Sequence, residues 1–283
     1  MRLRELYISG KDNLKRHRVD NPALESYLLL SKTNVISNIS EIYTHPEKEM
    51  ESETVGRFYE LLARRANNEP AAYILGQKEF YSRPFTVNPE VLIPRPETEL
   101  LAEETIRLCS TIYSPAVLDL GTGSGCIAVT VAAENSGARV FASDISQHAL
   151  DVAKENAWKN SVADRISFIQ GDLLSSFNKQ AFDIVVSNPP YVSESEFRAL
   201  EPEVKDCEPA LALLAGRDGL SCIKKIVTQA PRILKDGGWC LVEIGAGQSS
   251  SAMGLFEETG YSEISAHKDI SNTERVIKAQ WKK

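Results

Sequence analysis

Apolar residues return at two different spacings along this chain. Up to about residue 75 they recur every three or four positions, first at Leu24, Tyr27 and Leu28 and again within 54–66. This spacing predicts helices that each bury one face, and Asn21-Pro22 is a suitable helix start. We therefore expect residues 1–75 to form a small helical domain.

The spacing of apolar residues changes between residues 76 and 96. Short apolar runs that include 80–81, 85–87 and 91–93 are separated by Arg83-Pro84 and Asn88-Pro89. Such punctuation predicts a β-hairpin linker over 76–96. A helix should follow it, with Glu97 and Glu99 in the first turn, where acidic side chains favour the helix dipole. Helix capping is the default role of both glutamates, and lining a site beside the linker is the alternative.

From residue 115 onward, predicted strands and helices alternate. The strands cover 116–120, 140–144, 165–170, 182–187 and 237–244, with a weaker one over 261–266 and a closing segment over 275–281; the helices cover 126–133 and 147–159. Alternation of this kind predicts a doubly wound, mostly parallel α/β sheet for residues 97–283. Ligands of such sheets bind at the carboxyl ends of the strands.

Charge is divided unevenly between the two parts. The 283 residues are enough for two domains, and residues 1–90 carry 13 basic and 13 acidic side chains, against 19 and 26 in the remainder. A neutral and an acidic part together argue against duplex DNA or long RNA as a partner. Arg57, Arg64 and Arg65 are candidates for binding a protein, although solvent exposure is the default expectation for all three.

Composition also sets expectations about location and metals. The five cysteines form no C-x-x-C pair and the four histidines lie far apart, so we expect free thiols and no metal site. No stretch has the length and apolarity of a membrane span or of a signal peptide. A cytoplasmic protein with no membrane partner is therefore expected.

A glycine-rich loop, 121–125, follows the strand 116–120. Alone it is a weak signal, since Cys126 stands where the dinucleotide fingerprint has glycine or alanine. Asp144 ends the next strand and is placed to accept hydrogen bonds from ribose hydroxyls, and Asp172 follows the third strand, where it could accept from an adenine amino group. The loop has no Lys or Arg, so the pattern favours a nucleoside without phosphates, such as S-adenosylmethionine.

Asn188-Pro189-Pro190-Tyr191 follows the apolar strand 182–187. The prolines restrict the backbone, so the Asn188 amide and the Pro189 carbonyl can be held in fixed directions. Their two oxygens could accept both N–H bonds of a planar –NH2 group, while Tyr191 offers a ring for stacking. An ordinary Asn-Pro turn is the alternative, but the glycine loop upstream favours a binding site.

Several motifs in this order closely resemble the HemK/PrmC family, the glutamine N5-methyltransferases of peptide chain release factors. They are Pro94 to Glu99, Asp119 to Gly125, Asn188 to Tyr191, and Asp269 to Arg275. The resemblance implies a Rossmann-like sheet of seven strands with the last antiparallel, and an N-terminal domain that helps to hold the release factor. It implies methyl transfer from S-adenosylmethionine to the glutamine of a Gly-Gly-Gln motif, with S-adenosylhomocysteine as product.

The chain departs from the family pattern at two positions. Cys207 replaces an aromatic residue before Glu208-Pro209, and Leu173 stands where some members have tryptophan after the aspartate. Two alternatives to this function stay open at this point. One is a nucleic-acid methyltransferase acting on the exocyclic amine of adenine (N6) or guanine (N2), and the other is a binding protein for the cofactor or release factor without turnover.

The resulting assignment of site residues is as follows. We expect Asn188, Pro189 and Tyr191 to be catalytic and, together with Pro190, to bind substrate, and we expect the cofactor to bind Gly121, Thr122, Gly123, Ser124, Gly125, Asp144, Asp172, Leu173 and Asn188. Glu243 and Gln248 could face the same pocket, although an outward-facing Gln248 is the default. The expected partner is a release factor, with no direct contact to nucleic acid, and the chain is expected to act as a monomer.

Overall fold

The computed structural model describes residues 1–177 and 179–283, which divide into two compact units. The first unit comprises residues 1–77 together with 201–207, and the second comprises 78–200 together with 208–283. The chain therefore leaves the second unit at residue 201 and returns to it at residue 208. Nothing in the periodicity of the sequence indicates this excursion.

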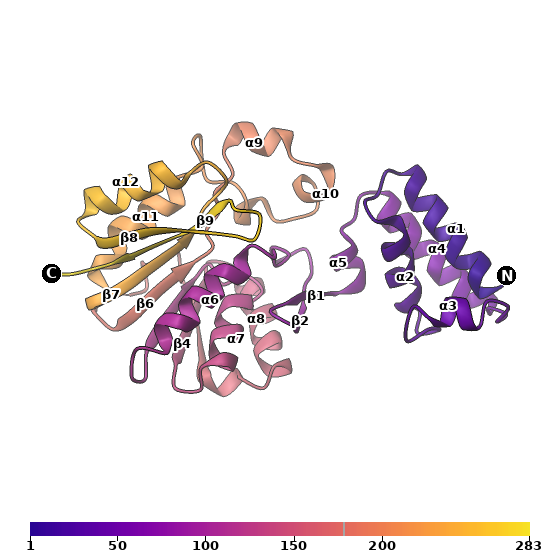
Figure 1. Ribbon diagram of the computed structural model, residues 1–283, viewed down its shortest axis with the longest axis horizontal. Helices are drawn as coiled ribbons and strands as arrows, with labels where there is room; N and C mark the ends of the chain where they lie inside the picture. The colour runs from indigo at the N-terminus through magenta and orange to yellow at the C-terminus, as the bar shows by residue number, and fades with distance from the viewer. Residues whose placement is uncertain (178) are drawn as a thin grey trace. The chain divides into compact units, whose positions relative to one another are not determined.

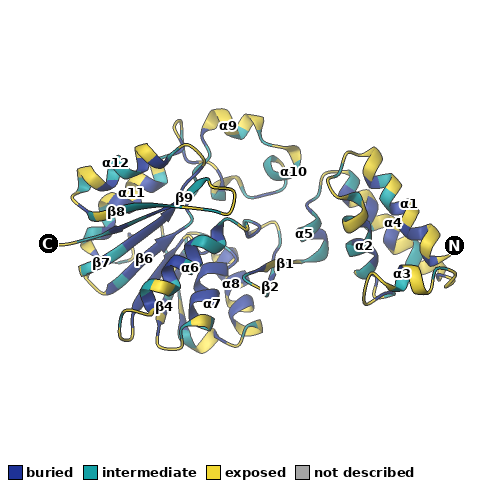
Figure 2. Cartoon of the chain, in the orientation of Figure 1, coloured by how far each residue is buried: buried dark blue, intermediate teal, exposed yellow. Residues whose placement is uncertain are grey.

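The first unit is built from short helices (Figure 1). They are α1 (Leu3–Arg16), α2 (Pro22–Ser31), α3 (Glu41–Thr44), α4 (Ser52–Ala66), α5 (Ala71–Leu75) and α10 (Pro202–Lys205). Their apolar faces bury a common core that includes Leu6, Leu14, Leu29, Phe58 and Leu62. Figure 2 shows one exposed and one buried face on α1 and on α4. The exposed residues are mostly polar, as the helical spacing of apolar residues predicts, apart from Ile8 and Tyr59.

Within this unit, a buried ion-pair cluster joins α4 to the segment 201–207. Arg65 is only 5% exposed, its Nε donates to Glu25 at 2.6 Å, and one terminal nitrogen donates to Glu203 at 2.7 Å. The expectation that Arg65 faces solvent is therefore wrong, because its charge is used inside the unit. Arg64 pairs with Glu69, and Arg57 is exposed. A paired buried guanidinium fixes position more than it adds stability, since both charges lose their hydration.

The second unit contains the predicted seven-stranded sheet. Its strands are β3 (Ala116–Leu120), β4 (Arg139–Asp144), β5 (Ile166–Gln170), β6 (Phe182–Ser187), β7 (Leu234–Glu243), β8 (Ser262–Lys268) and β9 (Glu274–Gln280). Their order is β5-β4-β3-β6-β7-β9-β8, and β9 runs antiparallel to both of its neighbours. This confirms the expected Rossmann-like sheet of seven strands, including its reversed last strand.

Helices cover both faces of this sheet (Figure 1). The apolar cluster on one face includes side chains of α6 (Thr98–Cys109), α7 (Cys126–Glu134) and α8 (Gln147–Lys159), and the cluster on the other includes those of α11 (Ser221–Gln229) and α12 (Ser249–Thr259). Alternate residues of β3 supply the two clusters, with Val117 in the first and Leu118 in the second. A strand buried on both faces explains why β3 is apolar almost throughout.

The remaining elements are short. A hairpin is formed by β1 (Gln77–Phe80) and β2 (Arg83–Thr86), while α9 (Glu194–Ala199) and three 3₁₀ turns, Ala163–Arg165, Ala210–Ala212 and Ala230–Arg232, lie in connections. The third apolar run of the expected linker, 91–93, is not a strand. It is a loop in which Val91 and Ile93 are buried, so apolar character here reflects packing without sheet pairing.

The described residues contain neither a disulfide nor a helix that could cross a membrane. All five cysteines are free, and burial raises the pKa of Cys109, Cys126 and Cys240 to about 12, which keeps these thiols neutral. Within residues 1–177 and 179–283, no helix combines the length and apolarity needed to cross a bilayer. The same residues contain no group of His, Cys, Asp or Glu side chains arranged to hold a metal ion.

Two helical glycines in the first unit provide a matched test of its packing. A Cβ added to Gly10 would lie 2.5 Å from the Phe58 ring, whereas one added to Gly56 would meet nothing within 4 Å. We expect Gly10→Ala to lower the free energy of unfolding by about 2 kcal/mol through overpacking. Gly56→Ala should raise it by roughly 0.5 kcal/mol through helix propensity. Urea unfolding of the full chain, followed by circular dichroism, measures both, and equal effects would contradict the packing of α1 against α4.

Candidate active site

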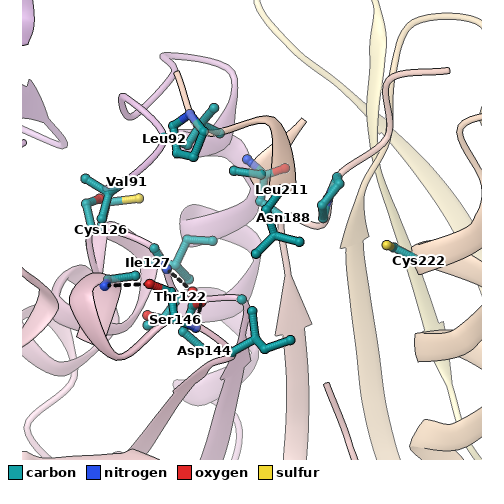
Figure 3. A pocket seen from close by; sticks show the side chains of 18 of the residues that line it. Val91, Leu92, Thr122, Cys126, Ile127, Asp144, Ser146, Asn188, Leu211 and Cys222 are labelled. Atoms are coloured by element: carbon teal, nitrogen blue, oxygen red, sulfur yellow. Dashed lines mark hydrogen bonds between the residues drawn. The ribbon is translucent and has the colours of Figure 1, made fainter. Parts of the chain in front are cut away.

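A cavity of about 500 Å³ lies at the carboxyl edge of the sheet, in the second unit (Figure 3). Its wall is formed by the loops that follow β3, β4, β5 and β6, by the 90–98 segment, and by residues from 209–212 and α11. The strand order reverses between β3 and β6, so this is the switch point at which open α/β sheets bind ligands. The volume is suitable for a small organic molecule.

The glycine loop after β3 forms one part of the wall. Gly121, Gly123 and Gly125 all have left-handed backbones, with φ of 68°, 54° and 80°. A Cβ at Gly121 or Gly123 would meet nothing within 4 Å, so these two positions leave room for a ligand against the backbone. Gly125 has a different function: a Cβ there would come within 3.0 Å of Ala153, so this glycine allows α7 to approach α8. Accordingly, Gly121 to Ser124 line the cavity and Gly125 does not.

Asp144, at the end of β4, holds the glycine loop and also lines the cavity. Its Oδ2 accepts from the backbone N–H of Gly123 at 2.9 Å, and its Oδ1 accepts from that of Ser146 at 2.9 Å (Figure 3). Burial raises the pKa of Asp144, and these two backbone hydrogen bonds oppose the rise. Each carboxylate oxygen keeps a lone pair, so Asp144 could still accept from ligand hydroxyls.

The loop after β5 contributes Asp172 and Leu173. Both line the cavity, and Asp172 is exposed, with no hydrogen bond from its carboxylate to the described residues. Leu173 has a left-handed backbone with φ of 47°, which costs a branched residue on the order of 1 kcal/mol. Its packing against the apolar cluster beneath α11 and α12 holds this conformation.

Asn188 lines the cavity next to the glycine loop (Figure 3). Its Nδ2 donates to the Thr98 hydroxyl at 3.0 Å, while its Oδ1 makes no hydrogen bond to the described residues. Pro190 also lines the cavity, but Pro189 and Tyr191 are not part of its wall. Tyr191 is half-buried, and its hydroxyl donates to Glu243 at 3.4 Å. The structure thus brings Asn188 and Pro190 together with the expected cofactor residues, and places Tyr191 behind them.

Two polar residues from distant parts of the chain, Gln248 and Thr98, support this loop. Gln248 donates from Nε2 to the Tyr191 carbonyl at 3.0 Å and accepts the Gly245 N–H at 2.9 Å through Oε1. The default expectation of an outward-facing Gln248 is therefore wrong. Thr98, the first residue of α6, is 2% exposed and lines the cavity.

Two carboxyl groups are buried next to the glycine loop and the Asn188–Tyr191 loop. Glu243 is 1% exposed, and burial, opposed by hydrogen bonding to Thr98 and Tyr191, raises its pKa to about 7. Asp119 is also 1% exposed and accepts from the Thr122 hydroxyl at 2.7 Å, and burial raises its pKa to about 7 as well. Neither lines the cavity, so both act on the groups that do.

The 90–98 wall is held by a third carboxylate. Glu208 is 5% exposed, and it accepts from the Ile93 N–H at 3.2 Å and from the Arg95 guanidinium at 2.6 Å. Glu99 accepts the Tyr81 N–H at 2.8 Å, which fastens α6 to the hairpin, and neither Glu97 nor Glu99 lines the cavity.

In the first unit, Cys207 donates to the Asn68 carbonyl at 3.5 Å. A thiol at this position thus makes a polar contact that an aromatic ring could not.

The sheet order and the glycine loop define the class of Rossmann-like methyltransferases. Methyltransferase small domain is the family description that matches residues 98–206, and PrmC N-terminal domain matches residues 5–76. The chain shares the fold of a methyltransferase from Pyrococcus furiosus, with a TM-score of 0.52 at 15% identity over 78% of this chain and 98% of that one. A ribosomal protein L11 methylase from Lactobacillus delbrueckii gives a TM-score of 0.51 at 21% identity, over 70% and 84% of the two chains.

Closer similarity identifies the family. Release factor glutamine methyltransferases are 38% identical in Caulobacter vibrioides, over 96% of this chain and 93% of the relative, and 39% identical in Nitratidesulfovibrio vulgaris, over 98% and 95%. The relative of the same name in Koribacter versatilis is 42% identical over 87% of each chain. The chain belongs to the release factor glutamine methyltransferase family.

The buried carboxyl of Glu243 generates a prediction about pH. Its folded pKa of about 7 lies above the ordinary value of 4.5, so the stability it contributes is present below pH 4.5 and is lost as pH rises through 7. Glu243→Gln does not titrate in this range. As pH rises from 5 to 8, we expect the free energy of unfolding of Glu243→Gln to increase relative to that of the unsubstituted protein by on the order of 2 kcal/mol. Urea unfolding at each pH measures the difference.

A matched carboxyl of opposite shift provides the control for this experiment. Hydrogen bonding to Ser193 lowers the pKa of Glu196, so Glu196→Gln should show no gain between pH 5 and 8. Its difference from the unsubstituted protein should instead change as pH falls below 4.5, where that carboxylate becomes protonated. A flat difference for Glu243→Gln between pH 5 and 8 would contradict the buried titration.

Proposed function

We propose that this chain transfers a methyl group from S-adenosylmethionine to the side-chain amide nitrogen of the glutamine in the Gly-Gly-Gln motif of peptide chain release factors. One observation carries the proposal. One of the two side-chain N–H groups of Asn188 is donated to Thr98, and the carbonyl oxygen makes no hydrogen bond to the described residues, which leaves it as an acceptor at a cavity beside the glycine loop. Family membership supports the same substrate, since the relatives are named for it.

The residues of the cavity fit S-adenosylmethionine. Gly121 and Gly123 leave open space against the backbone, and Asp144 keeps lone pairs for ribose hydroxyls. Asp172 adds a second, exposed carboxylate, which suits a ligand with a net positive sulfonium and an adenine amino group. When bound, S-adenosylmethionine supplies an electrophilic methyl group.

The acceptor nitrogen of an amide is a weak nucleophile, because its lone pair is delocalised into the carbonyl. In our proposal, the Asn188 Oδ1 and the Pro189 carbonyl accept both N–H bonds of the glutamine and hold its nitrogen in line with the methyl group. Positioning and electrostatics then provide the rate enhancement. The nitrogen gains the methyl as the carbon–sulfur bond breaks, and the cationic amide sheds its proton to water without a general base.

The role of Tyr191 in this proposal has two parts. Stacking on the glutamine amide is the part proposed from the sequence. The contacts of Tyr191 support a second part, in which its hydroxyl bond to Glu243 and its carbonyl bond to Gln248 keep the loop of Asn188 in place. The helical first unit is proposed to help hold the release factor, in the cytoplasm where translation ends.

A nucleic-acid amine is not favoured as the substrate. The net charge of the chain is −7, and a protein that binds phosphate backbones usually presents an excess of basic residues. A binding protein without turnover would have no need of an acceptor held at the cavity in this way.

The decisive measurement uses S-adenosylmethionine with a labelled methyl group. We expect label on a release factor, none on its Gln→Ala variant, and none on DNA. Asn188→Ala should lower turnover by about 100-fold, because the amide is no longer aligned, while affinity for S-adenosylhomocysteine changes by less than about threefold. Asn135→Ala, on a half-buried asparagine that follows α7 and does not line the cavity, is the matched control and should keep full turnover. Near-normal turnover of Asn188→Ala, or label on a nucleobase, would contradict the proposal.

A further inference from the structure

A short chain of buried polar groups lies behind Asn188. Asn188 Nδ2 donates to Thr98 Oγ1 at 3.0 Å, and hydrogen bonding with Thr98 opposes the rise that burial causes in the pKa of Glu243. Glu243 also accepts from the Tyr191 hydroxyl at 3.4 Å. Thr98 comes from α6, Glu243 from the end of β7, and the other two from the loop after β6. One carboxyl group is therefore linked to both ends of the Asn188–Tyr191 motif, directly at Tyr191 and through Thr98 at Asn188.

The direction of donation along this chain is fixed once Glu243 is ionised. Above its pKa of about 7 this carboxyl group only accepts, so a Thr98 hydroxyl that hydrogen-bonds to it must direct its single hydrogen toward Glu243. The Thr98 oxygen is then left as an acceptor, and it can bind Nδ2 of Asn188 but not Oδ1. Asn188 consequently presents its Oδ1 to the cavity. An asparagine whose amide were turned over would present N–H groups to the N–H groups of the glutamine.

Stability alone does not explain a glutamate at this position. Glu243 is 1% exposed, and its Oε2 has no hydrogen-bond partner among the described residues. Burying a carboxylate with a spare acceptor is unfavourable, and an apolar residue of similar volume is often at least as stabilising. The charged groups that act on it are Glu97, which opposes its ionisation, and Arg275, which favours it. A residue that is costly to bury, bonds one end of the motif and acts on the partner of the other end is placed for function.

We propose that Glu243 and Thr98 are positioning residues, which fix the orientation of the Asn188 amide so that its oxygen accepts from the glutamine side chain. This inference rests on the proposed function. It adds a reason why the first residue of α6 is a hydroxyl residue and why β7 ends in an acid. Neither residue needs to touch the substrate through its side-chain oxygen for the orientation to be set.

The test compares five variants of the full-length protein with labelled S-adenosylmethionine and a release factor, at pH 8.5, where Glu243 is ionised. Thr98→Val keeps the shape of the side chain and removes its hydroxyl, and we expect it to lower kcat by about 100-fold. Thr98→Ser restores the hydroxyl and should stay within about threefold of the unsubstituted rate. Glu243→Gln replaces a group that only accepts with one that can also donate, so the Thr98 hydrogen is no longer held toward residue 243 and can turn toward Asn188, and kcat should fall by a similar factor.

Thr105→Val is the matched control on the same helix. Thr105 is fully buried, and its hydroxyl donates to the Leu101 carbonyl at 2.8 Å, away from Asn188. Its substitution should leave kcat unchanged. In every variant, the KM for the cofactor and the affinity for S-adenosylhomocysteine should change by less than about threefold, because the proposed defect concerns the amide alone. A general loss of structure would instead alter both quantities and lower the thermal midpoint.

The double variant gives an independent decision. Residues that act as one unit are not additive, so Thr98→Val combined with Glu243→Gln should be no slower than the worse single variant by more than about threefold. The inference is overturned if Thr98→Val stays within threefold of the unsubstituted kcat, if Thr98→Ser is as slow as Thr98→Val, or if the two losses multiply. Should Thr98→Val not fold, the kcat of Glu243→Gln decides by the same threefold limit.

These results can be separated from a failure of the proposed function. The unsubstituted protein is assayed first, and an absence of label on the release-factor glutamine would contradict the proposed substrate itself. Label on the glutamine, with no effect of Thr98→Val, would contradict only the positioning role.

Discussion

The pairing of β3 with β6 at the centre of the sheet is the constraint on which the site depends. Leu120 lies opposite Ser187 at the carboxyl ends of the two strands, and the buried Ser187 hydroxyl donates to the Leu120 carbonyl at 2.7 Å. Because both strands stop at this level, Gly121 and Asn188 leave the sheet from neighbouring positions. A slip of one residue would exchange the two faces of β6 and move Asn188 away from the glycine loop. The apolar layers on both faces make such a slip costly, so the core fixes the site.

The sequence predicts those parts of the fold that depend on residues close together in the chain. Apolar runs such as 116–120 and 182–187 are strands because both of their faces are covered, and the glycines at 121, 123 and 125 have the left-handed backbones that the loop requires. Asn188 is found at the cavity because its motif directly follows a buried strand. The reversal of β9 is different. No periodicity indicates it, and it was expected only from the resemblance to a family.

The parts that the sequence does not predict depend on contacts between distant residues. Thr98 and Asn188 are 90 positions apart, Tyr191 and Glu243 are 52 apart, and Arg65 and Glu203 are 138 apart. Each of these side chains is ordinary in its own neighbourhood, and only the fold makes it a partner. The same reason explains the two wrong expectations of exposure, at Arg65 and Gln248. A polar residue on a helix or in a loop is assigned to solvent unless its partner is known.

Two buried acids, Asp119 and Glu243, reduce stability but support the walls of the cavity. Asp119 and Glu243 each leave one carboxylate oxygen without a hydrogen-bond partner in the described part of the chain, and burial raises the pKa of both to about 7. Each is unfavourable for folding, yet each acts on a hydroxyl residue of the cavity wall: Asp119 accepts from Thr122, and hydrogen bonding with Thr98 lowers the pKa of Glu243. The two acids therefore hold the two walls from behind, one under the loop expected to bind the donor and one under the residue expected to bind the acceptor. Precise relative placement of these two walls is what an in-line transfer requires, because a methyl group moves only between atoms already in contact.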